Sequence, residues 1–192
     1  MSLTTDLARL EQWLRLRSPT TWASLRPPAT LDAIDSAAHQ LGVRLLPDLK
    51  RLWRWHDGNE GALVAGLSLY PGHYLLGVNE ALDEWRSRTD VAGPSTHSRS
   101  WHPHWIPIAG DGAGNHLVVD HRPGPELGGV FVADLQNGPM RHRGRPSLPE
   151  LIGDLCDALT QGSPVEGHLP HLTEEGRLAW TPLPASARVR PM

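Results

Sequence analysis

Residues 105–120, WIPIAGDGAGNHLVVD, decide the fold that we predict for this chain. Two short apolar runs flank a glycine-rich turn, and a third apolar run, GGVFVADL, follows a second turn. We expect strands at about residues 105–109, 115–120 and 129–134. They should be sequential neighbours in one antiparallel sheet, because the turn at 110–114 is shorter than the dozen or more residues that a parallel crossover needs.

Helical periodicity dominates the chain before this region. Apolar residues recur at helical spacing up to Ser18-Pro19, then between an N-cap at Thr30 and a C-cap at Gly42, and again from Pro47 to the Asp57-Gly58 turn. These patterns predict three helices in the first third of the chain. Asn79 is suited to cap a fourth, short helix over residues 80–88.

The remaining segments complete the expected order of elements. We predict a strand in ALVAGLSLY (62–70), a polar loop at 89–100 that should be the most mobile segment, and a turn at Asn137-Gly138. A last helix should run from Pro149 to Gly162, and the tail with Leu178 and Trp180 has the pattern of an edge strand. Helices first, strands next and a helix last predict an α+β fold. We expect one domain at residues 1–162 and a C-terminal extension at 163–192.

Charge and cysteine content exclude several classes of partner and compartment. The chain has 18 Lys and Arg against 21 Asp and Glu, a net charge of −3, which does not favour binding to a phosphate backbone. Cys156 is its single cysteine and forms no internal disulfide. Neither a signal-peptide pattern nor an apolar run of membrane-spanning length is present. These features predict a cytoplasmic protein with no nucleic-acid or membrane partner.

The glycine-rich turn GDGAGNH, residues 110–116, does not match a known cofactor loop. A phosphate loop needs a following Gly-Lys-Ser/Thr, and a dinucleotide loop needs a third glycine where Leu117 stands. A calcium loop needs a ligand at Ala113 and a glutamate at Arg122. The turn is typical of a hairpin, and we expect no cofactor.

Histidines and carboxylates near this turn raise the question of a metal or catalytic site. The candidate metal ligands fall into two groups, His97, His102 and His104 in one and His116, Asp120 and His121 in the other. Strand alternation separates His121 from the other two, and no Cys pair or H-E-x-x-H helix is present, so we expect no metal site. A small hydrolase built on His116 and Asp120 stays open as an alternative. Cys156 fits a buried, inert thiol better than a nucleophile.

Tryptophan is the unusual feature of the composition, with eight residues against one Phe and two Tyr. Trp13 and Trp53 lie on expected core faces, whereas Trp55, Trp101 and Trp105 lie at a helix end or beside the polar loop. Core packing explains each of these singly, but the group is typical of a protein-binding surface. The expected protein-binding residues are Trp55, His56, Asp57, Trp101, Asp111 and Asn115, with aromatic anchors and acidic groups that steer association.

Two motifs together resemble the SUKH superfamily, the Smi/Knr-type proteins. They are LGVRLLPDLKRLWRWHDGNEG, residues 41–61, and the W-x-P-x-W-I-P-I-A-G-D-G-A-G-N-H-L-V-V-D pattern at residues 101–120, followed by GGVFVAD. The resemblance covers about residues 5–160. The positions that match the family pattern are Leu46-Pro47, Asp57-Gly58, Gly110 to Asn115 and Asp120.

The resemblance implies an α+β fold without catalytic activity. Many bacterial members resemble immunity proteins that bind and neutralise a toxin domain, and fungal relatives act as interaction hubs in cell-wall synthesis. We therefore expect a non-enzymatic protein-binding module, with a cognate toxin domain as the expected partner. A regulatory scaffold is the alternative.

Overall fold

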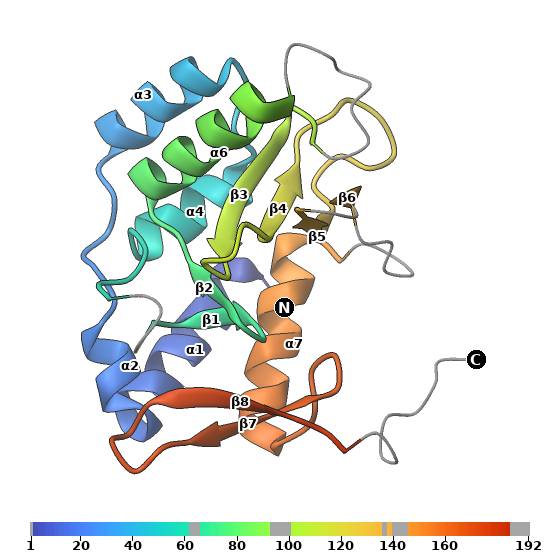
Figure 1. The fold of residues 1–192 in the computed structure, drawn as a ribbon. Coiled ribbons are helices and arrows are strands. Elements are labelled where there is room, and N and C mark those ends of the chain that lie inside the picture. Colours follow the sequence, from blue (N-terminus) through green and yellow to red (C-terminus); the bar gives the residue numbers. More distant parts are fainter. Residues whose placement is uncertain (1, 62–65, 93–100, 136–137, 140–145, 185–192) are drawn as a thin grey trace.

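The computed structural model describes residues 2–61, 66–92, 101–135, 138–139 and 146–184. Within them, an antiparallel sheet with strand order β1-β2-β3-β4-β5-β6 packs against helices, and a separate hairpin follows (Figure 1). The predicted α+β class is confirmed. No helix among these residues has the length and apolar character needed to cross a membrane.

The centre of the sheet consists of β3 (Trp105–Gly110), β4 (His116–Asp120) and β5 (Val130–Asp134). Val119 in β4 lies opposite Ile106 on one side and Val130 on the other, and both pairings are antiparallel. The prediction of three sequential antiparallel neighbours is confirmed.

The outer strands are β1 (Ser68–Tyr70), β2 (His73–Leu75) and β6 (Gly138–Pro139). Of the strand predicted at 62–70, residues 68–70 form β1, residues 66–67 precede it, and residues 62–65 lie outside the described part. Pro71-Gly72 then turns the chain back into β2. Gly72 has φ +77°, which glycine adopts without strain. A turn was predicted at Asn137-Gly138. Gly138 instead belongs to a strand that pairs with β5, and Asn137 lies outside the described residues.

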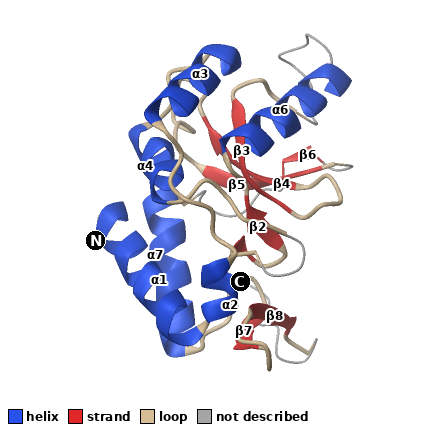
Figure 2. Cartoon of the chain, turned by 90° about the vertical axis from the view of Figure 1, so that its left-hand side faces the viewer, coloured by secondary structure: helices blue, strands red, loops and turns tan. Residues whose placement is uncertain are grey.

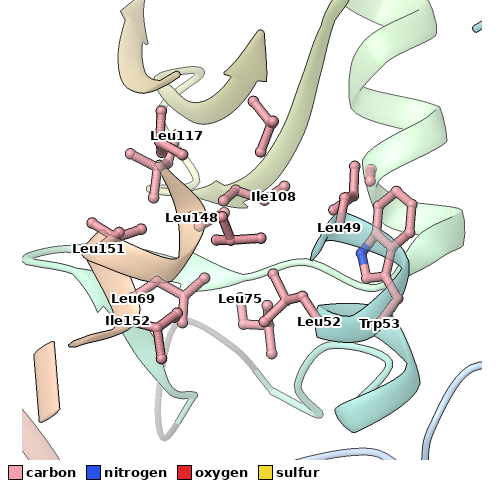
Figure 3. Packing of buried hydrophobic residues seen from close by; sticks show 14 of the residues in the cluster. Leu49, Leu52, Trp53, Leu69, Leu75, Ile108, Leu117, Leu148, Leu151 and Ile152 are labelled. Atoms are coloured by element: carbon pink, nitrogen blue, oxygen red, sulfur yellow. The ribbon is translucent and has the colours of Figure 1, made fainter. Parts of the chain in front are cut away.

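Three helices gather on one side of the sheet, α1 (Leu3–Arg17), α4 (Pro47–Trp55) and α7 (Leu148–Gln161), as Figure 2 shows. The apolar side chains on one face of each helix pack against alternate residues of the sheet. The close view in Figure 3 labels part of this core, namely Leu49, Leu52, Trp53, Leu69, Leu75, Ile108, Leu117, Leu148, Leu151 and Ile152. Burial of these side chains is the main stabilising term of the fold.

Local capping signals fixed several helix ends as predicted. Thr30 Oγ1 accepts the Ala33 N–H at 3.1 Å and begins α3 (Leu31–Leu41), and Gly42 ends it with φ +65°. Gly162 ends α7 in the same left-handed conformation. Short polar side chains and glycines satisfy the terminal backbone groups here without help from distant residues.

Two helices differ from the predictions. A proline at its first turn begins α2 (Pro19–Ala23), directly after the predicted stop of α1. The helix α6 (Val78–Ala92) is longer than the predicted 80–88, so residues 89–92 of the predicted loop are helical, and 93–100 lie outside the described residues. The N–H of its first residue, Val78, is satisfied by a carboxylate from a distant segment, described below, and not by Asn79.

The tail forms a sheet of its own. Strands β7 (His168–Leu172) and β8 (Leu178–Pro182) form a two-stranded sheet. The strand expected around Leu178 and Trp180 is therefore present as β8, but it does not lie at an edge of the main sheet. The hairpin is attached to α2, where the Leu178 N–H donates to Thr21 Oγ1 at 3.0 Å. The domain boundary at residue 162 stays a prediction.

The sheet is buried on both faces. One face meets α1, α4 and α7, while the side chains of the other form a second cluster. That second cluster consists of Trp101, Trp105, Val118, Phe131 and Ala133, with Trp85 of α6 packed against it. An antiparallel sheet commonly leaves one face to water. Here every residue of β3 and β4 is buried.

His121 connects the two matched motifs. Its Nε2 accepts the N–H of Leu46, the residue before α4, at 3.2 Å, and its Nδ1 lies 3.1 Å from the carbonyl oxygen of Val119. The ring therefore uses its neutral form, with Nδ1 as the donor. Burial lowers its pKa below the ordinary value of 6.5.

This arrangement predicts a loss of stability in mild acid. Because the folded pKa of His121 lies below 6.5, the unfolded chain binds more protons as the pH falls through that value, and the free energy of unfolding should decrease. Burial lowers the pKa of His73, His102 and His116 in the same direction. Urea unfolding at pH 7.5 and 5.5 should therefore show lower stability at pH 5.5.

Replacement of His121 isolates its share of this effect. His121→Gln should reduce the difference between the two pH values, whereas His39→Gln, an exposed control on α3, should keep the wild-type difference. An unchanged pH dependence in folded His121→Gln would contradict the role of this ring.

Candidate protein-binding surface

Three predicted binding residues, Trp55, His56 and Asp57, lie half-buried where α4 ends. The Asp57 carboxylate does not project freely, because its Oδ1 accepts the Val78 N–H at 2.7 Å and caps α6. The Asp57 N–H donates to the Pro27 carbonyl oxygen at 3.1 Å. Asp57 thus joins the helical part of the chain to α6.

Arg26 and two glycines complete this junction. The Arg26 Nε–H donates to the Asp57 carbonyl oxygen at 2.5 Å, and its Nη2 pairs with the Glu80 carboxylate, which also accepts the Gly77 N–H at 2.7 Å. Gly58 has φ +80°, and a Cβ there would lie 2.4 Å from the Gly77 nitrogen. The Asp57-Gly58 pair of the first motif is therefore required by close backbone packing.

An aromatic cluster lies beside this junction. The His56 ring contacts Trp22 and Trp55 edge to face, with centroid distances of 5.2 and 4.6 Å. Arg15 lies over the Trp22 ring at 4.4 Å, and Glu11 accepts the Trp55 indole N–H at 3.2 Å and pairs with Arg15 at 2.7 Å. We call these five partly exposed residues the Trp22–Trp55 surface.

Asp111 and Asn115 lie elsewhere, in the turn between β3 and β4. Asp111 accepts the N–H groups of Ala113 and Asn115 at 2.8 and 3.0 Å, and also the Asn115 side-chain amide at 2.6 Å. Burial alone would raise the pKa of Asp111, but these hydrogen bonds lower it overall. Asn115 Oδ1 accepts the Leu135 N–H at 2.9 Å. Both residues fix the hairpin and its connection to the end of β5.

Trp101 is a core residue, contrary to the expectation that it lies on a binding surface. It is 1% exposed, contacts Trp105 with a centroid distance of 6.0 Å, and donates its indole N–H to Thr89 Oγ1 at 3.3 Å. Thr89 belongs to the part of α6 that the sequence predicted as loop. The longer helix therefore supplies the partner that buries this indole.

His116 and Asp120, the candidates for a hydrolase, lie on the same sheet face as Val118 and the second core cluster. Both are buried, and His116 Nε2 lies 3.0 Å from a Glu84 carboxylate oxygen while Asp120 forms an ion pair with Arg122 at 2.6 Å. Burial lowers the pKa of His116 and keeps the ring neutral. Neither of these contacts joins a base to a hydroxyl or thiol nucleophile.

Other reactive groups do not converge in the described part of the chain. Among those residues, no three His, Cys, Asp or Glu side chains are grouped so that they could hold a metal ion; His97 lies outside them. Cys156 is buried, and burial raises the pKa of its thiol to about 11. A thiol with that pKa stays protonated near neutral pH.

Trp22 and Arg15 belong to the exposed surface but were not predicted from the sequence. Trp22 lies on α2, a five-residue helix that the pattern did not predict, and only the fold brings it to His56. For Arg15 the available signal was its spacing from Glu11. Residues four apart on a helix lie on the same face, so Glu11 and Arg15 could have been predicted to form an ion pair.

Comparison with known proteins agrees with this fold and with its motifs. Residues 28–152 match the model of the SMI1 / KNR4 family (SUKH-1), so the chain belongs to that family. The chain is 22% identical over 165 residues to a glucan synthesis regulatory protein of Neurospora crassa, covering 62% of this chain and 31% of the relative. It is 27% identical over 142 residues to the cell wall biosynthesis/cell cycle regulator smi1 of Schizosaccharomyces pombe, covering 61% and 28%. The chain thus spans about a third of these curated relatives.

The cap on α6 predicts a stability role for Asp57. Asp57→Ala removes the acceptor of the Val78 N–H and should lower the free energy of unfolding by about 1–2 kcal/mol in urea titrations. Asp57→Asn keeps an acceptor oxygen and should lose less. Asp35→Ala, which removes only an exposed ion pair to Lys50, is the control and should change little. Equal stability of Asp57→Ala and wild type would contradict the capping role.

Proposed function

We propose that this chain is a non-enzymatic protein-binding module that docks a partner on the Trp22–Trp55 surface. The observation that carries the proposal is the group of two tryptophans and a histidine that remains partly exposed although a large core was available to bury them. Tryptophan and arginine are the residue types most enriched at the energetic centres of protein interfaces.

The geometry of this surface favours tight binding, because its side chains are already held in place. His56 Nδ1 lies 2.5 Å from the Arg26 carbonyl oxygen, and the Trp55 indole is bound to Glu11. Little side-chain entropy is then lost when a partner binds. Glu11 and Arg15 provide charged groups at the rim, where they influence orientation and association rate.

A regulatory role is the function that we favour. The two curated relatives are named as regulators, of glucan synthesis in one case and of cell wall biosynthesis and the cell cycle in the other. By this proposal the present chain regulates by binding, and it does so in the cytoplasm, where the thiol of its single cysteine stays reduced.

Neutralisation of a toxin domain is retained as a second proposal on the family resemblance. Asp57 and Asp111 are poorly suited to steer a basic toxin surface. Both carboxylates accept hydrogen bonds within the chain. A toxin partner would have to bind mainly through the aromatic residues of the Trp22–Trp55 surface.

Binding measurements on tryptophan variants test the proposal. The full chain serves as bait in cells of its source, the captured protein is purified, and its affinity is measured by calorimetry. Trp22→Ala and Trp55→Ala should each weaken binding by about 30-fold, which corresponds to about 2 kcal/mol. Thermal melting verifies that each variant is folded.

Trp13→Ala is the matched control, because Trp13 is also a half-buried tryptophan but lies outside this surface. It should retain wild-type affinity. If folded Trp22→Ala and Trp55→Ala bind the partner as tightly as wild type does, this surface is not the interface. Identification of the captured protein as a toxin or as an enzyme of wall synthesis distinguishes the two proposed roles.

A further inference from the structure

A cavity of about 250 Å³ lies between the main sheet, α7 and the loop that leads from α7 to β7. Figure 1 shows α7 beside the sheet and this loop below its end. The walls are mainly apolar and come from Leu69, Leu117, Val130 and Val132 in the sheet, Leu151 and Leu155 on α7, and Val165 in the loop. The volume is below the range of small-molecule sites, about 300–1,000 Å³, so the cavity is suited to one or two side chains.

Two carboxylates give this cavity an acidic rim. Asp154 on α7 and Glu166 in the loop both line the cavity and are exposed, and no Lys or Arg is among the described residues that line it. Tyr70 also lines the cavity, where burial and the nearby charge of Glu166 raise its pKa to about 12. An apolar cavity with an acidic rim favours a segment that combines an apolar side chain with cations.

The end of the C-terminal hairpin lies directly beside this rim. Leu183 follows β8, and its N–H donates to the Gly167 carbonyl oxygen at 2.7 Å. Gly167 is the neighbour of Glu166 in the chain. The next segment, residues 185–192 with the sequence ASARVRPM, lies outside the described residues. This segment therefore starts next to the cavity.

The composition of residues 185–192 is complementary to the cavity. Arg188 and Arg190 flank Val189, and the segment contains no Asp or Glu. Successive side chains of an extended chain point to opposite sides, so Val189 can enter the cavity while the longer arginine side chains extend along its rim. Val189 is five positions after Pro184, and five extended residues span up to about 17 Å. That length is sufficient for a segment that begins beside the rim.

We infer that residues 185–192 dock in this cavity, with Val189 as the apolar anchor. Arg188 and Arg190 then pair with the two rim carboxylates. Exposed ion pairs contribute little by themselves, so the anchor supplies the contact and the charges set its orientation. A short connection gives an effective concentration of about 1 mM, at which a contact with a Kd of about 1 mM is half occupied. The contact is separate from the Trp22–Trp55 surface and does not depend on that proposal.

Paramagnetic relaxation in the full chain tests the inference. Met192→Cys provides a thiol for a maleimide spin label, while Cys156 stays unlabelled because burial raises the pKa of its thiol to about 11. Wild type treated with the same reagent verifies this selectivity. The label should reduce the intensity of the amide signals of Val132 and Leu155, which line the cavity. Signals of α3, which lies at the opposite end of the molecule from the hairpin in Figure 1, should not change.

Variants of the labelled chain separate docking from mere proximity. Val189→Asp replaces the anchor with a charge that the rim repels, and it should restore most of the lost intensity. Asp154→Asn combined with Glu166→Gln removes the rim charges and should restore part of it. Asp83→Asn, which removes an exposed carboxylate on α6 outside the cavity, is the matched control and should keep the full loss. An equal loss in folded Val189→Asp would overturn the inference.

Two further measurements need no variant in the segment or the cavity. Higher ionic strength should restore part of the intensity, because salt screens exposed ion pairs. A loss that neither salt nor the rim variants reduce would contradict the pairing with the carboxylates. In a mixture of spin-labelled chains and isotope-labelled chains without a spin label, the signals of the cavity should keep their intensity. A loss there equal to that in the single chain would overturn the inference, because the segment would then dock in a second copy.

Discussion

Burial of the central sheet on both faces is the constraint on which the rest of the structure depends. Alternation in β4 points Leu117 and Val119 towards the helices and sends His116, Val118 and Asp120 to the opposite face. Because that face is also closed to water, each polar group on it needs a partner. Glu84 is the partner of His116 Nε2, Arg122 is the partner of Asp120, and Trp101 covers the face from outside the sheet. Among the described residues, His116 Nδ1 and Trp105 Nε1 are buried on this face without a hydrogen-bond partner.

Local signals were sufficient for the parts of the fold that depend on neighbouring residues. The order of β3, β4 and β5 followed from short turns, and the ends of α3 followed from Thr30 and Gly42. The start of α6 did not follow, because its cap is Asp57, 21 positions earlier in the chain. A window of sequence around Asn79 contains no trace of that carboxylate, so the helix was predicted to begin at residue 80 and not at Val78.

The same distinction between local signals and contacts of distant segments explains which features of the candidate site could be predicted. Asp57, Asp111 and Asn115 were predicted as binding residues, with the acidic groups steering association. In the structure Asp57 and Asn115 satisfy backbone donors of other segments, and Asp111 satisfies donors of its own turn. These hydrogen bonds give each of the three residues a structural role within the two motifs. Trp55 and His56 lie at the helix end where the sequence pattern placed them, whereas the contact of Trp22 with His56 required knowledge of which helix lies next to α4. Contacts between distant segments are the information that the pattern lacks.

The Trp22–Trp55 surface combines the family-matched segment with a flanking one, because it adds residues before position 28 to the end of α4. Function resides in sites that a fold carries and not in the fold itself, so a segment beside the matched scaffold can contribute binding residues of its own. This surface and the C-terminal hairpin meet at α2, where Thr21 holds the hairpin and the adjacent Trp22 contacts His56. This short helix, which local periodicity did not reveal, thus sets the position of both.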